Sequence, residues 1–201
     1  MPLERQHTSL KLVSSNILDV QNIKSLDNFD CGEESVNNFL QNDAIDKEQK
    51  NLFSTTVFYS DDKSDIAGFY SLTSSIVEVK GYQDMKIFKT ISTDDEDDMR
   101  TISYPAIEIA WLGVNKRFQG QDYGANMLLD LFRTVINVRF SLGIGTTGIT
   151  VSALAGAVEF YQKYHFGYLH KDYDKVDIML CAYPMFIPIS VVLNIVSELD
   201  R

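Results

Sequence analysis

The sequence predicts an α+β fold, a mixed sheet with helices crossing it. Segments rich in β-branched and aromatic residues recur along the chain and alternate with helical patterns. One helix carries an unbroken apolar stripe and follows an apolar strand through a glycine-containing turn. The length of 201 residues fits one domain, and the composition, 45% hydrophobic and 23% charged, is that of an ordinary globular protein.

Charge and cysteine content exclude several classes of protein. Lys and Arg total 18 against 28 Asp and Glu, and a net charge of −10 argues against binding nucleic acid over the whole surface. One local basic patch stays compatible with that charge. The two cysteines, Cys31 and Cys181, form no CxxC pair, so neither a zinc knuckle nor a disulfide framework is supported. The expected location is a reducing cytoplasm.

The sequence gives no sign of a membrane segment. Residues 1–7 lack the apolar core of a signal peptide. The longest apolar stretch, around residues 186–196, is too short to span a bilayer. We therefore expect no membrane partner.

The N-terminal quarter predicts one strand and one helix. Residues 10–18 alternate loosely between apolar and polar side chains, which favours a strand. Asp30, followed three residues later by Glu33, is typical of a helix start. Apolar residues at helical spacing continue the helix to about Gln49, namely Val36, Phe39, Leu40 and Ala44.

A hairpin and an acidic insertion come next. Residues 53–59 and 66–79 are rich in β-branched and aromatic side chains, and the polar run between them predicts an antiparallel hairpin. Residues from about 80 to 103 form an acidic insertion with five consecutive carboxylates at 94–98. A solvated loop is the favoured interpretation of that run. The alternative is that these carboxylates attract a cationic substrate electrostatically.

The central segment, a strand, a turn and a helix, carries the most information. Residues 106–114 form an apolar strand interrupted by Glu108. After the turn, apolar residues fall on one helical face, at Gly124, Met127, Leu128, Leu131, Phe132 and Val135. A helix start offers free N–H groups to phosphate oxygens, and small residues in the turn leave room for them. The pattern fits a pyrophosphate site and a ligand-free turn equally well, and it matches neither a P-loop nor GxGxxG.

The C-terminal third predicts short elements. Ser152 is placed to cap a helix over about residues 153–164. Three strands are expected, at residues 149–151, 166–170 and 176–182. Pro184 and Pro188 should break the chain before a short terminal helix. Residues from about 184 to 201 would then be a C-terminal extension of a single domain covering 1–201.

Two motifs in the second half resemble the GNAT acyltransferase superfamily. Residues 108–128 resemble its motif A, a strand, then Q/R-x-x-G-x-G/A, then a helix, filled here by Gln119, Gly120, Gln121, Asp122, Tyr123 and Gly124. Asp122 stands where the family usually has its first glycine. Residues 158–166 resemble motif B, A-x-x-F-Y-x-x-x-G-F, with His165 in place of the glycine. The two motifs occur in the expected order and at the expected separation.

A third match points to one subgroup of that family. Residues 29–32 and 36–40, with 66–72, resemble acetyltransferase toxins of bacterial toxin–antitoxin pairs. The resemblance implies a mostly antiparallel sheet with splayed central parallel strands flanked by helices. It implies acetyl coenzyme A as cosubstrate and aminoacyl-tRNA or an antitoxin protein as partners. A homodimer is a frequent state in the family.

The resemblance also assigns the coenzyme site. Backbone groups of Leu112 and Val114, which flank Gly113, would pair with the pantetheine arm as an added strand does. The Leu112 amide could also polarise the thioester carbonyl. Pyrophosphate would be held by the amides of Gln119, Gly120, Gln121, Asp122, Tyr123, Gly124 and Ala125. Arg117 either assists electrostatically or is an ordinary exposed loop arginine.

Two side chains are implied to carry the chemistry. Glu108 would be the base that makes the amine neutral, and the alternative is a glutamate that is exposed or salt-bridged. Tyr161 would be the acid that protonates the leaving thiolate, with Tyr164 as fallback; the alternative is a packed aromatic residue. The three histidines show no metal spacing, so no metal is expected. Trp111 is expected in the core, and Cys31 is not expected to be a nucleophile.

The resemblance therefore implies an N-acetyltransferase that works by direct attack in a ternary complex. The acceptor would be aminoacyl-tRNA, or a small-molecule or protein amine that the net charge would favour if it is cationic. The alternative, based on Asp122 and His165, is a degenerate fold that serves as a binding or regulatory protein without catalysis.

Overall fold

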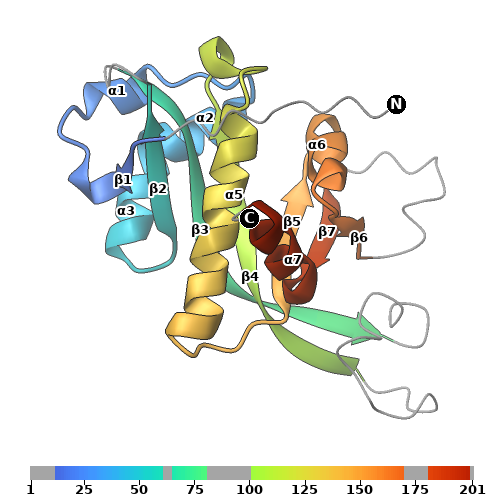
Figure 1. Cartoon of the computed structure of the whole chain (residues 1–201). Coiled ribbons are helices and arrows are strands. Elements are labelled where there is room, and N and C mark those ends of the chain that lie inside the picture. Colours follow the sequence, from blue (N-terminus) through green and yellow to red (C-terminus); the bar gives the residue numbers. More distant parts are fainter. Residues whose placement is uncertain (1–11, 61–64, 81–100, 170–180, 200–201) are drawn as a thin grey trace. The chain divides into compact units, whose positions relative to one another are not determined.

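The computed structural model describes residues 12–60, 65–80, 101–169 and 181–199 (Figure 1). Within them, seven strands form one mixed sheet in the order β1-β2-β3-β4-β5-β7-β6. The strands are β1 Ser14–Asn16, β2 Ser54–Tyr59, β3 Ile66–Lys80, β4 Thr101–Val114, β5 Gly148–Ala153, β6 Gly167–Tyr168 and β7 Tyr183–Pro188. Strand β4 pairs parallel with β5, while β1–β2, β5–β7 and β6–β7 pair antiparallel. The α+β prediction, with a parallel pair inside a mixed sheet, is confirmed.

Helices and single turns connect these strands. The α-helices are α1 Lys24–Asp27, α2 Glu34–Asn38, α3 Ala44–Gln49, α5 Tyr123–Ile136, α6 Val158–Lys163 and α7 Ile189–Leu199. The 3₁₀ turns are η1 Ile17–Asp19, η3 Lys116–Phe118 and η5 Ala155–Ala157. The π-helical turns are η2 Phe39–Asp43 and η4 Asn137–Ser141. None of the helices in the described ranges is both long and apolar enough to cross a membrane.

The chain divides into two compact units. The first comprises Met1–Ser71 and Trp111–Leu131, and the second Leu72–Ala110 and Phe132–Arg201. The expectation of a single domain stays a prediction.

Aromatic side chains fill the core of the first unit. Phe39 stacks on Trp111 with ring centroids 4.5 Å apart, and Phe29 meets Phe69 edge to face at 5.4 Å. Aliphatic residues complete this cluster, among them Ile17, Leu26, Leu40 and Val57. Burial of this surface is the main stabilising contribution of the unit. Trp111 therefore belongs to the core, as the sequence predicts.

The N-terminal elements differ from the predictions in their boundaries. Strand β1 holds only three residues, because Asn16 caps the 3₁₀ turn that follows and accepts from the Leu18 N–H at 2.9 Å. The helix starts at Glu34 rather than at Asp30, and no side chain caps it. Asp30 instead accepts hydrogen bonds from the Gly32 N–H and Asn37 Nδ2. The predicted end at Gln49 is confirmed.

The predicted hairpin and the acidic insertion lie partly outside the described residues. Strands β2 and β3 occupy nearly the predicted ranges and are neighbours in the sheet. The acidic run at 94–98 is not among the described residues, nor are His7 and His170. Strand β4 starts at Thr101, within the predicted insertion.

The second unit corrects two predictions. Ser152 lies inside β5 and caps nothing, and helix α6 starts only at Val158. The final strand is β7, whereas Cys181 and the next residue form a bend and the rest of the predicted strand at 176–182 lies outside the described residues. The terminal helix α7 is confirmed, and it packs on β5 and β7 (Figure 1).

The two prolines of β7 do not break the strand, and the register explains why. Pro184 pairs with Ser152 of β5, and its carbonyl accepts from the Leu169 N–H at 3.0 Å, on the β6 side. Backbone groups alternate in direction along a strand, so the nitrogens of Pro184 and Pro188 both point away from β5. Their missing N–H groups therefore remove no hydrogen bond from the β5–β7 ladder.

Candidate functional site

The turn between β4 and α5 is built around two residues in left-handed conformation. Gly120 has φ +72° and Asp122 has φ +60°. Glycine adopts this region at no steric cost, and aspartate is among the few other residues that tolerate it. Asp122 thus keeps the backbone conformation that a glycine would give at the same position. Its side chain is exposed.

Helix α5 starts directly after this turn and presents its N-terminus there. The Asn126 N–H donates to the Asp122 carbonyl at 3.0 Å, which is the first bond of the helix. The amides of Gly124 and Ala125 belong to the first turn, where no carbonyl of the helix can accept them. The predicted apolar stripe is confirmed, since Met127, Leu128, Leu131, Phe132 and Val135 are all fully buried. This burial fixes the helix axis, and with it the direction of the N-terminal amides.

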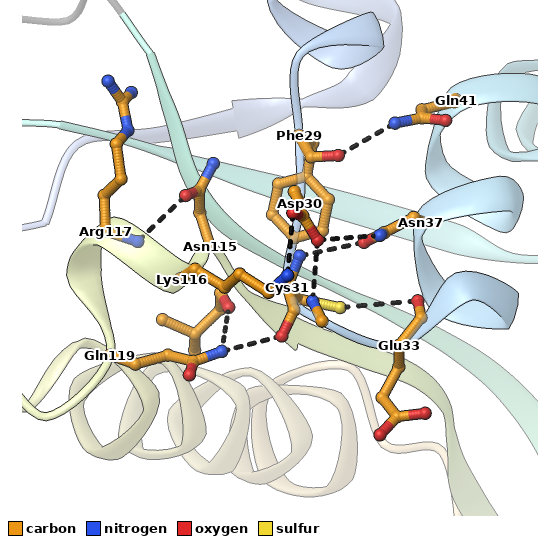
Figure 2. A network of polar contacts seen from close by, with 12 residues as sticks. Phe29, Asp30, Cys31, Glu33, Asn37, Gln41, Asn115, Lys116, Arg117 and Gln119 are labelled. Carbon is orange, nitrogen blue, oxygen red and sulfur yellow. Dashed lines mark hydrogen bonds and ion pairs between the residues drawn. The ribbon is translucent and has the colours of Figure 1, made fainter.

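Side-chain amides hold the turn in shape. The Gln119 Nε2 donates to the carbonyls of Cys31 at 2.8 Å and Val114 at 2.9 Å (Figure 2). Gln121 Nε2 donates to the Arg117 carbonyl at 2.8 Å. The Gln119 side chain therefore spans from the end of β4 to a distant loop, a contact that the sequence did not predict.

Asp30 is the centre of a second set of bonds (Figure 2). Its carboxylate accepts from Lys116 Nζ at 2.9 Å, from the Gly32 N–H at 2.9 Å and from Asn37 Nδ2 at 3.0 Å. The hydrogen bond from Lys116 is the largest cause that lowers the pKa of Asp30 below its ordinary value of 3.8, and those from Gly32 and Asn37 add to it. A lowered folded-state pKa means that the contribution of this carboxylate to stability is present above about pH 4 and is lost as the pH falls further.

Arg117 is exposed and already engaged. Its guanidinium forms an ion pair with Asp65 and lies 5.5 Å from the centroid of the Phe118 ring. Its N–H donates to Asn115 Oδ1 at 3.1 Å, which begins the 3₁₀ turn. A phosphate at this turn would have to share Arg117 with Asp65.

The end of β4 presents one backbone edge away from β3. The Asn115 N–H donates to the Ala67 carbonyl of β3 at 2.9 Å. Because backbone groups alternate along a strand, Gly113 faces β3 as well, while Leu112 and Val114 face the opposite way. The Val114 carbonyl there accepts the Gln119 amide. The Leu112 backbone thus has the direction that the predicted pantetheine pairing requires.

In the second unit, Tyr161 is held by the C-terminal cap of α6. The His165 N–H donates to the Gln162 carbonyl at 3.0 Å and the Phe166 N–H to the Tyr161 carbonyl at 3.2 Å. With His165 at φ +66° and the Phe166 ring 5.2 Å from that of Tyr161, this is a Schellman motif with its hydrophobic contact. His165 again occupies a left-handed position that favours glycine.

The phenol of Tyr161 is buried. The side chain is 5% exposed, and this burial raises the pKa of its phenol well above the ordinary value of 10. A phenol is protonated at neutral pH with or without this shift, and the raised pKa makes its proton harder to release. Tyr164, the fallback, is half-buried, with its ring 5.4 Å from that of Phe160.

Glu108 lies beside an unsatisfied hydroxyl. It is half-buried on β4, and it pairs in register with Thr150 of the parallel strand β5. Side chains of register partners point to the same face of a sheet. The Thr150 hydroxyl is the one buried side-chain oxygen that lacks a hydrogen-bond partner within the described residues. An unsatisfied buried hydroxyl costs about 1–3 kcal/mol, so it marks a place where a ligand could supply the partner.

The remaining candidates take structural places. Cys31 is half-buried, and burial raises the pKa of its thiol, which disfavours a thiolate nucleophile. Sequence reasoning did not predict Asp30, Asn37 or Thr150 as parts of a site. Asp30 was interpreted as a helix start and Asn37 was visible only as a member of a matching segment, while a threonine in a strand carries no signal of its own.

No protein-family model matches this chain, but solved structures share its fold. A bacterial toxin is 19% identical with a TM-score of 0.73, over 93% of this chain and 96% of that chain. A mutant AtaT toxin bound to the C-terminus of the antitoxin AtaR and acetyl-CoA is 18% identical with a TM-score of 0.64, over 92% and 97%. AtaT complexed with acetyl-methionyl-tRNAfMet is 20% identical with a TM-score of 0.68, over 92% and 98%. These structures share the predicted fold over more than nine tenths of this chain, so the likeness to toxins is confirmed at the level of the fold.

Proposed function

We propose that this chain with a GNAT fold is an N-acetyltransferase that moves an acetyl group from acetyl-CoA to a primary amine. The observation that carries the proposal is the turn after β4, where Gly120 and Asp122 adopt left-handed conformations ahead of α5. A turn of this kind aims first-turn amides and the positive end of the helix dipole at one point. Acetyl-CoA in a structure with the same fold supports the choice of ligand.

The chain offers a separate group for each part of the coenzyme. The first-turn amides of Gly124 and Ala125, with those of the turn from Gln119 onward, would hold the pyrophosphate. The Gln119 N–H also donates to the Lys116 carbonyl at 3.4 Å, so the ligand would share it. The outward-facing backbone of Leu112 would pair with the pantetheine arm, as an added strand does. Val114 would contribute mainly its N–H, because its carbonyl already accepts the Gln119 amide.

Two side chains of the second unit would move the protons. Glu108 would take a proton from the acceptor ammonium, so that the neutral amine can attack the acetyl carbon. The new C–N bond forms as the C–S bond breaks, and Tyr161 would give its proton to the leaving sulfur. The nitrogen then loses its second proton to become an amide, and that proton would restore the Tyr161 phenol. A phenol enters the reaction protonated at neutral pH whatever its burial, and the raised pKa makes its proton harder to release, so this role rests on the resemblance of residues 158–166 to motif B.

For the acceptor we propose the α-amino group of an aminoacyl-tRNA. AtaT complexed with acetyl-methionyl-tRNAfMet has the same fold over 92% of this chain, which supports this class of acceptor. Because the chain carries a net charge of −10, tRNA phosphates would have to be held by a local group of Lys and Arg side chains, and such contacts weaken as salt is added. An antitoxin protein is the partner that the toxin-like fold suggests.

The competing function is a degenerate fold that binds without catalysing. Its sequence argument is that Asp122 and His165 replace family glycines. Both residues nevertheless keep left-handed backbone, at φ +60° and +66°. A turn and a cap that retain this geometry favour a working site over a degraded one.

Calorimetric titration with acetyl-CoA, followed by a transfer assay, tests the proposal. We expect micromolar binding and acetylation of charged tRNA but not of uncharged tRNA. Binding without transfer to charged tRNA, polyamines or protein amines would favour the non-catalytic alternative. Absence of binding would refute the assignment of the turn.

A further inference from the structure

We propose that residues Asp30, Cys31 and Gly32, here called the DCG loop, brace the turn after β4, and that Asp30 and Gln119 are positioning residues for coenzyme binding. This inference rests on the proposed function for its link to acetyl-CoA. It differs from the role predicted for Gln119, since its side chain acts on the protein rather than on the ligand.

The first contact of the brace is the Gln119 amide. One nitrogen, Nε2, donates to the Cys31 carbonyl at 2.8 Å and to the Val114 carbonyl at 2.9 Å. Figure 2 shows this side chain reaching from its own turn to the DCG loop. The two acceptors, Cys31 and Val114, are 83 residues apart in sequence, so a single side-chain amide joins two distant segments. Gln119 begins the segment whose amides would hold the pyrophosphate.

The second contact involves Lys116 with both its backbone and its side chain. Its N–H donates to the Asp30 carbonyl at 2.8 Å, and its Nζ lies 2.9 Å from the Asp30 carboxylate. The ion pair is exposed, so its electrostatic energy alone is small. The contact matters for geometry instead, because Asp30 and Lys116 are joined both through their backbones and through their side chains.

The DCG loop is itself held firmly. Gly32 adopts φ +100°, and its N–H donates a hydrogen bond to the Asp30 carboxylate. A Cβ at Gly32 would lie 3.1 Å from Lys116 Cε, so the loop packs directly against the lysine. Asn37 of α2 closes the loop, with Nδ2 on the Asp30 carboxylate and Oδ1 accepting from the Cys31 N–H at 2.9 Å. The brace thus connects α2 to the turn through one continuous set of bonds.

A braced turn lowers the cost of binding. Ligands bind more tightly to groups that are already ordered, because less conformational freedom is lost on binding. Removal of the two Gln119 bonds should weaken acetyl-CoA binding about tenfold, because the loosened turn must be ordered again when the coenzyme binds. The rate of the chemical step should not change, because neither Asp30 nor Gln119 would touch the reacting atoms.

Gln119→Met and Asp30→Ala test the proposal in the full-length protein. Gln119→Met keeps the approximate size and the neutrality of the side chain but cannot donate to the two carbonyls. Asp30→Ala removes all three bonds of the carboxylate. Asp46→Ala is the matched control, because Asp46 forms a similar exposed ion pair with Lys50 at 2.8 Å on α3.

Two readouts separate the brace from the proposed function. Hydrogen exchange of the amides at residues 119–125, measured without coenzyme, should be faster in both variants and unchanged in the control. The Kd and KM for acetyl-CoA should rise about tenfold with kcat nearly constant, which identifies a loss of positioning. If the wild type binds no acetyl-CoA, the proposed function fails and the exchange data alone decide whether the brace exists.

Three results would overturn the inference. Unchanged exchange in both variants would show that the DCG loop does not brace the turn. Faster exchange with unchanged Kd and KM would show that the brace does not serve binding. A loss of kcat equal to the loss in kcat/KM would assign these residues to the chemistry instead.

Discussion

Replacement of Asp122 tests the turn after β4 most sharply, because two properties of this residue can be changed separately. Its carboxylate places a negative charge at the expected pyrophosphate site, and its Cβ stands on a backbone at φ +60°. Asp122→Asn removes the charge and keeps the Cβ, and asparagine tolerates the left-handed region. Asp122→Gly removes both.

The expected changes in stability are small, because three effects of similar size oppose one another. Glycine relieves about 1 kcal/mol of left-handed strain, but it adds about 0.5–1 kcal/mol of unfolded-state entropy. Loss of the carboxylate also removes its favourable interaction with the dipole of α5, which contributes about 0.3–1 kcal/mol to stability. We expect the free energy of unfolding to change by less than about 1 kcal/mol, or a Tm shift below about 4 °C.

The expected change in affinity is larger. Repulsion between the carboxylate and each phosphate charge about 7 Å away costs about 0.6 kcal/mol in water, so two charges cost about 1.2 kcal/mol. Acetyl-CoA should therefore bind about sevenfold more tightly to Asp122→Asn at low ionic strength. At 0.15 M salt the gain should shrink, because the Debye length falls to about 8 Å.

Titration calorimetry at two salt concentrations measures both variants. Asp46→Asn, with the same change in net charge at an exposed site on α3, controls for long-range effects. A gain confined to Asp122→Gly would show that the carboxylate points away and that only the Cβ obstructs. No gain in either variant would refute the placement of pyrophosphate at this turn.

Four further predictions concern the second unit and the two thiols. Tyr161→Phe should lower kcat at least about 100-fold with an unchanged Kd for acetyl-CoA; a nearly normal kcat would leave Tyr161 as a packed aromatic residue only. His165→Gly should raise the Tm by only about 1–2 °C, because relief of the left-handed strain at φ +66° is largely offset by the unfolded-state entropy that glycine adds, and a lower Tm in thermal denaturation would contradict that account. Thr150→Val should leave the Tm equal or higher and slow acetyl transfer, whereas Thr150→Ser should keep the rate; equal rates in both would exclude a role for the hydroxyl. Cys31 should react with iodoacetamide more slowly than the exposed Cys181 at neutral pH, because burial raises the pKa of the Cys31 thiol, and its rate should rise with pH. Mass spectrometry of the labelled peptides measures both rates, and faster labelling of Cys31 would contradict this prediction.

The sequence was sufficient to predict the elements whose patterns are local. Helix α5 has five large apolar residues at helical spacing, and all five are buried. The segment from β4 to α5 could be read from a strand, a glycine turn and a helix in succession. Trp111 was placed in the core because alternation puts it opposite Glu108 on β4.

Elements fixed by distant partners could not be predicted in the same way. Asp30 looked like a helix cap, but Lys116, 86 residues later, competes for its carboxylate. Strand β7 was not predicted because prolines usually break a strand. Pro184 and Pro188 are tolerated only because their nitrogens face away from the β5–β7 hydrogen bonds, and this depends on the register between the two strands. Likewise, the orphan hydroxyl of Thr150 becomes visible only when β5 lies next to Glu108.

The most direct test of the central claim is mass analysis of a charged tRNA after incubation with this protein and acetyl-CoA. We predict that the aminoacyl group gains the mass of one acetyl group, that hydrolysis of acetyl-CoA alone is negligible, and that Tyr161→Phe abolishes most of the gain. If no acetyl group appears on charged tRNA, polyamines or protein amines while the wild type is folded, the assignment as an N-acetyltransferase is wrong.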